Sequence, residues 1–118
     1  MTEDDLKKRT KKFALRILKL ISALPNTTAG RTISNQLARS DTSVPANYRA
    51  ACRGRSKAEF ISKIGDSLKE IEETEYWLEL LVDSGCVSAP QMAALLDETR
   101  QLIAIFTTID KNAKKGPS

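Results

Sequence analysis

The sequence contains no histidine, and this absence limits the chemistry that the chain can perform. Histidine is the most common general base in enzymes and the most common transition-metal ligand. A di-iron site of the four-helix carboxylate type needs two Glu-x-x-His motifs and therefore cannot be built. The chain also lacks a metal-ligand pattern and a nucleophile motif. We expect no catalytic residue, no metal site and no cofactor, and we expect that the protein is not an enzyme.

Other residue types are scarce, and their scarcity narrows the fold class. Aromatic residues make up 5% of the chain, and its 5 glycines and 4 prolines fall mostly between periodic runs. This composition favours helices over a β fold with many turns. The two cysteines, Cys52 and Cys86, form no C-x-x-C pair, so we expect each to be a small buried hydrophobic residue.

Long apolar runs are missing as well. No window approaches the roughly 18 apolar residues of a membrane span, and the charged start MTEDDLKKRTKKF lacks the apolar core of a signal peptide. We therefore expect a cytoplasmic protein that does not contact a membrane.

Apolar residues that recur every three or four positions predict four helices. The first runs from about Asp4 to Leu24, with Thr2 as its cap. The second starts near Thr27 or Thr28, the third covers residues 57 to about 83, and the fourth opens at Ser88. Short connections between amphipathic helices imply an all-α, antiparallel up-down-up-down four-helix bundle. We expect a single domain over residues 1–113 and a disordered tail over residues 114–118.

The second helix is predicted to be kinked or broken, because the stretch SDTSVP interrupts its pattern. Ser43 is a suitable cap for a resumed helix, and Pro45 is tolerated in a first turn. Two capping boxes are also predicted, Ser56 with Glu59 before the third helix and Ser88 with Gln91 before the fourth.

Charge is distributed unevenly along the chain. Residues 1–63 contain 14 Lys or Arg against 5 Asp or Glu, whereas residues 64–118 contain 5 against 10. The first two helices are therefore basic and the third is acidic. Such a basic surface suits the phosphates of a nucleic acid, and Tyr48 is available to stack on a base. The candidate phosphate contacts are Arg9, Lys12, Arg16, Lys19, Arg49, Arg53 and Arg55.

A second interpretation of these cations stays open. They are either solvated or paired with the acidic residues of the third helix, within one subunit or across a subunit contact. These acidic residues are Glu70, Glu72, Glu73, Glu75 and Glu79. Pairs such as Glu75 and Glu79 share a helix face, but without histidine or a nucleophile motif we interpret them as a solvated or salt-bridged face.

Three residues of the third helix, Tyr76, Trp77 and Leu80, lie off its main apolar seam. Leu15 and Leu18 likewise widen the apolar side of the first helix. Two interpretations fit, a wide core or an apolar patch that forms an oligomer interface.

The chain resembles the bacterial four-helix-bundle proteins of the 23S rRNA intervening-sequence family, also called S23 ribosomal proteins. The resemblance covers about Leu6 to Ile109 and includes the stretches FALRILKLISALP and GRTISNQLARSDTSVPANYRAACRGRSKAEFISKIGDSLKEIEETEYWLELL. Its most specific parts are TSVPANYRAA (42–51) and EYWLE (75–79). This chain has Asp41 and Pro45 where glycine is common in the family.

The resemblance implies an antiparallel four-helix bundle that assembles as a homopentameric ring and has no established catalytic activity. It also implies kinship with the accessory subunit of diversity-generating retroelements, a basic pentamer that engages nucleic acid and a reverse transcriptase. By this kinship the basic stripe of the first helix, together with Arg49, Arg53 and Arg55, would contact nucleic acid.

Two hypotheses therefore emerge from the sequence. One is a homo-oligomeric bundle that binds RNA or DNA through a basic face. The other is a protein-interaction scaffold whose charges serve subunit or partner contacts.

Overall fold

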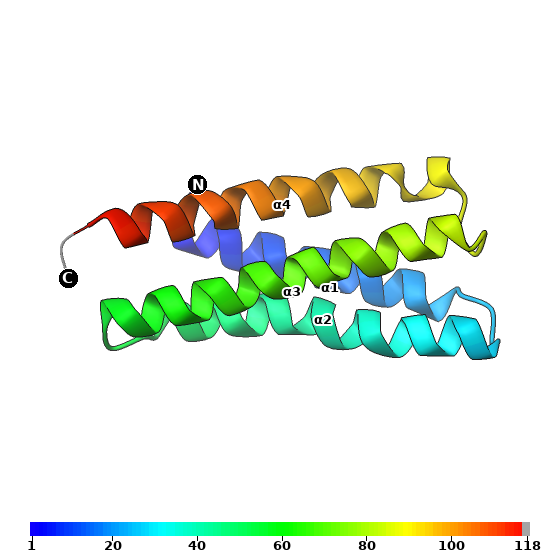
Figure 1. Cartoon of the computed structure of the whole chain (residues 1–118), viewed down its shortest axis with the longest axis horizontal. Coiled ribbons are helices and arrows are strands. Elements are labelled where there is room, and N and C mark those ends of the chain that lie inside the picture. The colour runs from blue at the N-terminus through cyan, green and yellow to red at the C-terminus, as the bar shows by residue number, and fades with distance from the viewer. Residues whose placement is uncertain (117–118) are drawn as a thin grey trace.

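Four α-helices form a narrow bundle in the computed structural model, which describes residues 1–116. They are α1 (Glu3–Ser22), α2 (Thr28–Cys52), α3 (Lys57–Asp83) and α4 (Ala89–Lys115). The helices run along the long axis of a molecule that measures 49 × 22 × 21 Å (Figure 1). Successive helices alternate in direction, so the predicted all-α four-helix bundle is confirmed.

The helices do not pack equally against one another. α2 and α3 share the most extensive contact, followed by α3 with α4 and α1 with α2. By contrast, the backbones of α1 and α4 lie farther apart than those of these three pairs. Side chains of α1 nevertheless reach α4, since Arg9 bonds to Glu98.

The helix starts follow from local capping chemistry. The Thr2 hydroxyl accepts a hydrogen bond from Asp5 N, and the Asp5 carboxylate accepts one from Thr2 N, which makes a full capping box. Ser88 and Gln91 form the predicted box before α4. The predicted box before α3 is only half correct, because the Ser56 hydroxyl caps the helix but the Glu59 carboxylate accepts from Arg55 N at 2.9 Å.

The predicted break in the second helix is wrong, because α2 is continuous from Thr28 to Cys52 with Pro45 in its interior. Ser43 does not cap a new helix. Its hydroxyl instead donates to the Arg39 carbonyl at 2.7 Å, as an ordinary helical serine does. The long contact with α3 holds this region helical across the proline. A bend at Pro45 stays a prediction.

Two helix ends differ from the predicted ones. α1 ends at Ser22, two residues before the predicted end, and α4 continues through Lys115. The predicted tail from residue 114 is thus wrong for Lys114 and Lys115, which belong to α4. Residues 117–118 of that predicted tail lie outside the described residues. After α3, Gly85 closes the helix with a φ of 81°, a left-handed conformation that suits glycine.

The core is a continuous apolar cluster with large side chains from all four helices. Phe13 and Ile17 come from α1 and Leu37 and Val44 from α2, and all four are at most 1% exposed. α3 and α4 complete the cluster with Ile64, Ile71, Leu78, Leu81, Met92, Leu102 and Phe106. Burial of this surface is the main force that holds the bundle together.

Candidate nucleic-acid interface

Arg9, one of the predicted phosphate contacts, forms hydrogen bonds within the protein. Its guanidinium donates from Nε and Nη2 to the two carboxylate oxygens of Glu98 on α4, each at 2.8 Å. Nη2 also donates to Gln101 Oε1 at 2.9 Å. The hydrogen bond from Arg9 is the main cause that lowers the pKa of Glu98. Arg9 therefore joins α1 to α4 and is not free to bind phosphate.

The other basic residues of α1 follow Arg9 along the same side of the helix. Lys12 and Arg16 are exposed, and their positive charges also lower the pKa of Glu98, so both lie near α4. Lys19 continues the row one turn further and is exposed. We call Arg9, Lys12, Arg16 and Lys19 the α1 basic row. Glu98 partly neutralises this row.

The predicted arginines of α2 form a second basic surface. Arg49 and Arg53 stand one turn apart on the exposed side of α2, and Arg55 is exposed in the connection to α3. None of these three guanidiniums makes an ion pair within residues 1–116. We call Arg49, Arg53 and Arg55 the α2 arginine cluster.

The seven predicted contacts therefore do not form one continuous face. The α1 basic row turns toward α4, whereas the α2 arginine cluster lies on the outside of α2. Lys11 is not among the predicted contacts, although it is exposed and follows Lys7 by one turn. Because the charge of Lys7 acts on Cys52 of α2, this side of α1 faces α2, and Lys11 extends the positive charge of α1 toward that helix. The run KKRTKK indicates Lys11 in the sequence, because a run of this length places basic side chains on two faces of a helix.

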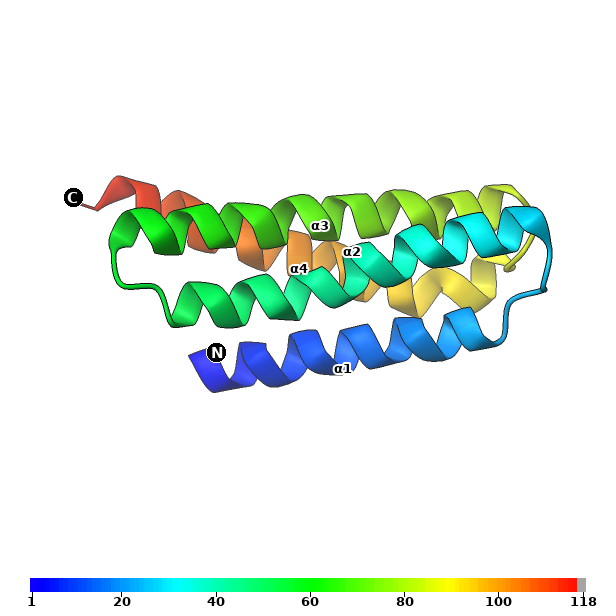
Figure 2. The same cartoon turned by 90° about the horizontal axis from the view of Figure 1, so that it is seen from below.

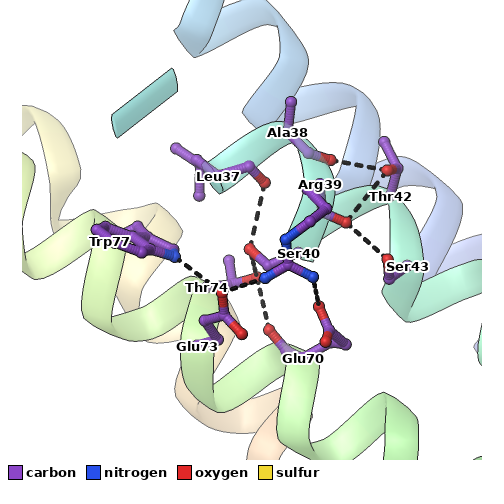
Figure 3. Close-up of polar contacts among 10 residues, drawn as sticks. All are labelled: Leu37, Ala38, Arg39, Ser40, Thr42, Ser43, Glu70, Glu73, Thr74 and Trp77. Atoms are coloured by element: carbon purple, nitrogen blue, oxygen red, sulfur yellow. Dashed lines mark hydrogen bonds and ion pairs between the residues drawn. The ribbon is translucent and has the colours of Figure 1, made fainter. Parts of the chain in front are cut away.

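The acidic residues of α3 pair with other arginines than the predicted ones. Arg39 of α2 donates to Glu70 at 3.0 Å and forms a short contact with Glu73, which also accepts a hydrogen bond from Trp77 (Figure 3). Hydrogen bonding from Arg39 is the main cause that lowers the pKa of Glu73.

On the other side of α3, Arg100 of α4 reaches Glu75 at 3.0 Å and Glu79 at 3.7 Å. Glu72 is exposed and makes no ion pair within the described chain. Intramolecular pairing of the predicted cations with α3 is therefore wrong. The acidic residues of α3 do form a salt-bridged face, as expected, but with Arg39 and Arg100.

Tyr48 is not available to stack on a base, so this part of the prediction is wrong. The side chain is 5% exposed, and its ring meets the Phe106 ring edge-on, with centroids 5.5 Å apart. Tyr48 lies on the inward face of α2, one position from the exposed Arg49. A single sequence cannot separate these two faces within the interrupted pattern around Pro45.

The predicted oligomer residues occupy different environments. Tyr76 is 56% exposed and lies edge-on to the half-buried Trp77, with ring centroids 5.1 Å apart. Trp77 and Leu80 pack against the core from its edge. Of the three residues, only Tyr76 offers a large exposed surface in one subunit.

Three further features bear on the kinds of site the molecule contains. Cys52 and Cys86 are free thiols that are partly buried and pack against the edge of the core, so the expected burial is only partial. In residues 1–116, no cluster of three or more His, Cys, Asp or Glu side chains is suited to hold a metal ion. Over the same residues, each helix is too short or too polar to span a lipid bilayer.

Comparison with known proteins identifies the family. The family model of the 23S rRNA-intervening sequence protein matches residues 3–108. The chain belongs to the 23S rRNA-intervening sequence protein family.

A member of the S23 ribosomal protein family from Bacteroides thetaiotaomicron VPI-5482, a protein with unknown function, has a similar crystal structure with a TM-score of 0.87. The two sequences are 35% identical, over 94% of this chain and 99% of that chain. A search of curated proteins gave no match. The fold of this 23S rRNA-intervening sequence protein is therefore that of its family, and the family carries no indicated catalytic activity.

Proposed function

We propose that the protein is a non-enzymatic homo-oligomer, in the form of a pentamer, that binds RNA or DNA through the α2 arginine cluster. The observation that carries the proposal is that Arg49, Arg53 and Arg55 are exposed and make no ion pair within residues 1–116, while Arg39 and Arg100 engage the acidic residues of α3. An arginine guanidinium can bind two phosphate oxygens at once. Three guanidiniums close together at the end of α2 therefore suit a phosphate backbone.

The α1 basic row is assigned a secondary role in this proposal. Lys12, Arg16 and Lys19 add positive potential that draws a polyanion to the molecule. Because Glu98 lies beside the row and Arg9 is already bonded to it, we expect these residues to contribute less than Arg49 and Arg53.

The test is a fluorescence-anisotropy titration of labelled RNA and DNA, single- and double-stranded, at two salt concentrations. The doubly substituted variant Arg49→Glu/Arg53→Glu should weaken binding at least about tenfold and reduce the slope of log affinity against log salt by about 1 to 2, because two phosphate contacts are lost. The matched control is Lys111→Glu/Lys115→Glu, which changes the net charge equally at exposed sites of α4. We expect the control to retain most of the affinity.

An equal loss in both variants would mean that only net charge matters and would contradict the assigned site. A larger loss in Lys12→Glu/Arg16→Glu would move the site to the α1 basic row.

A second candidate function is a protein-interaction scaffold, favoured by the exposed apolar side chains Leu15, Leu18 and Tyr76. If no nucleic acid binds even at low salt, the scaffold function is favoured, with a protein partner bound at the basic surfaces. A reverse transcriptase, which the family resemblance implies, is then the first partner to test.

A further inference from the structure

A cavity of about 690 Å³ opens at the end of the bundle where α1 begins. α1 has 20 residues and α4 has 27, so at 1.5 Å per residue α1 is shorter by about 10 Å. In both views α1 starts well inside the end that α3 and α4 reach (Figures 1 and 2). The cavity lies at this end of the bundle, between the first turns of α1 and residues 104–109 of α4.

The walls of the cavity are apolar and come from all four helices. Leu6 of α1, Ala51 of α2 and Phe60 of α3 face Ile105 and Ile109 of α4. Phe60, Ile105 and Ile109 are only partly buried and pack against the edge of the core. The volume falls within the range of about 300–1,000 Å³ that is typical of small-molecule sites, which are likewise mostly apolar with a few polar groups.

Polar side chains also line the cavity, namely Thr2, Glu3, Tyr48, Cys52 and Thr108. The Cys52 thiol lies beside the Tyr48 hydroxyl and the Glu3 carboxylate, and its proximity lowers the pKa of Glu3. Lys7 Nζ lies 3.2 Å from one oxygen of Glu3. A carboxylate has about four lone-pair sites, so Glu3 can still accept a hydrogen bond from a ligand. Among the described lining residues, Glu3 is the one side chain that is charged at neutral pH.

We propose that this cavity binds a small amphipathic amine, whose apolar body packs against Phe60, Ile105 and Ile109 and whose ammonium group pairs with Glu3. An anionic head would meet no cationic side chain among the described lining residues; the positive charges nearby are the α-ammonium group of Met1, which lines the cavity, and Lys7, which pairs with Glu3. The site adjoins the α2 arginine cluster, because Gly54 between Arg53 and Arg55 lines the cavity, but none of the three arginines is itself a lining residue.

The two cysteines provide an internal test. Cys52 lines the cavity, whereas Cys86 lies in the α3–α4 connection at the opposite end of the bundle. The Cys86→Ser variant reports the reaction of Cys52 with iodoacetamide, and the Cys52→Ser variant reports that of Cys86. The probes are decylamine, 1-decanol and decanoate, which share one apolar chain and differ in the head group.

Decylamine should slow alkylation of Cys52 saturably, by about tenfold when its concentration is ten times the dissociation constant. Alkylation of Cys86 should be unchanged. We expect decanol to protect more weakly than decylamine and decanoate least. In a Glu3→Gln background, the advantage of the amine over the alcohol should fall by about three- to fivefold, as expected when an exposed charge pair is lost.

A matched pair of substitutions locates the binding. Ala104 lines the cavity and is exposed, so Ala104→Trp should fill the space and abolish protection. Ala94, also exposed on α4 but distant from the cavity, supplies the control Ala94→Trp, which should leave protection intact.

Three results would overturn the proposal. The first is that none of the probes protects Cys52, and the second is that decanoate protects as well as decylamine. The third is that Cys52 becomes protected without any probe as the protein concentration rises, because a second copy of the chain would then cover the cavity.

Discussion

The polar side chains of the core show how closely single residues are matched to their surroundings. Thr10, Thr74 and Thr99 donate to carbonyl oxygens of their own helices, and Ser67 of α3 donates to Val44 O of α2 at 3.0 Å. Ser40 of α2 and Thr74 of α3 also share a hydrogen bond of 2.9 Å (Figure 3). These hydroxyl groups are fully buried, yet each has a partner, as burial of polar groups requires.

Asp41 is the exception among these buried polar residues. It is fully buried, and neither oxygen of its carboxyl group has a hydrogen-bond partner in the described part of the chain. Burial raises the pKa of Asp41 to about 8. The folded protein therefore holds this proton at pH values where the unfolded chain, with a carboxyl pKa near 4, has released it.

The sign of the effect on stability follows from this difference. Between about pH 4 and pH 8 the folded state binds one proton more than the unfolded state at Asp41, so the free energy of unfolding falls as pH rises. Above pH 8 both states are ionised, and the slope from this residue vanishes.

We predict that Asp41→Asn makes stability less dependent on pH. Asparagine is close to the same size and cannot ionise, so the variant should lose less free energy of unfolding between pH 5 and pH 8 than the wild type, by on the order of 3 kcal/mol. Urea denaturation at the two pH values measures this difference. Asp4→Asn, at an exposed site, is the control and should follow the wild type. Equal pH dependence in the wild type and in Asp41→Asn would show that Asp41 is not the group responsible.

At the scale of the secondary-structure element, α2 is the helix whose sequence conflicts most with its structure. Pro45 has no N–H group to donate to the carbonyl of Asp41, four residues earlier, and its ring crowds that carbonyl. α2 nevertheless stays helical, because its inward residues Leu37, Val44 and Tyr48 are buried and its contact with α3 is the largest in the bundle. Packing against the neighbouring helices therefore offsets the free-energy cost of a proline inside α2.

Replacement of the proline tests this account. Pro45→Ala restores a helix donor, so we predict that the free energy of unfolding rises by about 1–2 kcal/mol, less than the full cost of about 3 kcal/mol for a proline in a helix interior because some ring packing is lost. The matched control Ala46→Pro introduces a proline at the exposed neighbouring position and should destabilise the protein by about 3 kcal/mol or more. Thermal and urea unfolding give both values. A Pro45→Ala protein less stable than the wild type would mean that the ring contributes more by packing than it costs in the helix.

Helix caps can be predicted from this sequence, whereas features that depend on packing between helices cannot. Thr2, Ser56 and Ser88 were identified as helix caps because capping depends on residues within one turn. The continuity of α2 and the burial of Tyr48 depend on neighbouring helices, so the local pattern around Pro45 predicted both incorrectly. Arg39 and Arg100 pair with the acidic residues of α3 because of the rotation of each helix about its axis. The number of charges in each segment does not reveal this rotation.

At the scale of the whole molecule, charges of opposite sign gather on different helices, and each of these helices also exposes apolar side chains. The positive charge lies on α1 and α2, whereas α3 presents Glu72 and Tyr76 on its exposed side. Leu15 and Leu18 are 56% and 36% exposed on the basic helix α1. The basic, leucine-bearing side of α1 and the acidic, tyrosine-bearing side of α3 are thus complementary in charge, and each exposes apolar side chains. Contact between unlike surfaces of identical subunits produces a ring when the rotation closes.

The last prediction concerns this assembly. If Tyr76 anchors a subunit contact, Tyr76→Arg places a charge in an apolar interface and should shift the molar mass in solution from several times 13.0 kDa toward 13.0 kDa. Light scattering coupled to size-exclusion chromatography, over a range of protein concentrations, gives the mass directly. Thr107→Arg, at an exposed position of α4, should leave the mass unchanged. A wild-type protein that stays monomeric at every concentration would contradict the oligomer, whereas an oligomer that tolerates Tyr76→Arg would place the contact elsewhere. Because the assembly would repeat the α2 arginine cluster in each subunit, it would also multiply the affinity for a long nucleic acid beyond that of one subunit.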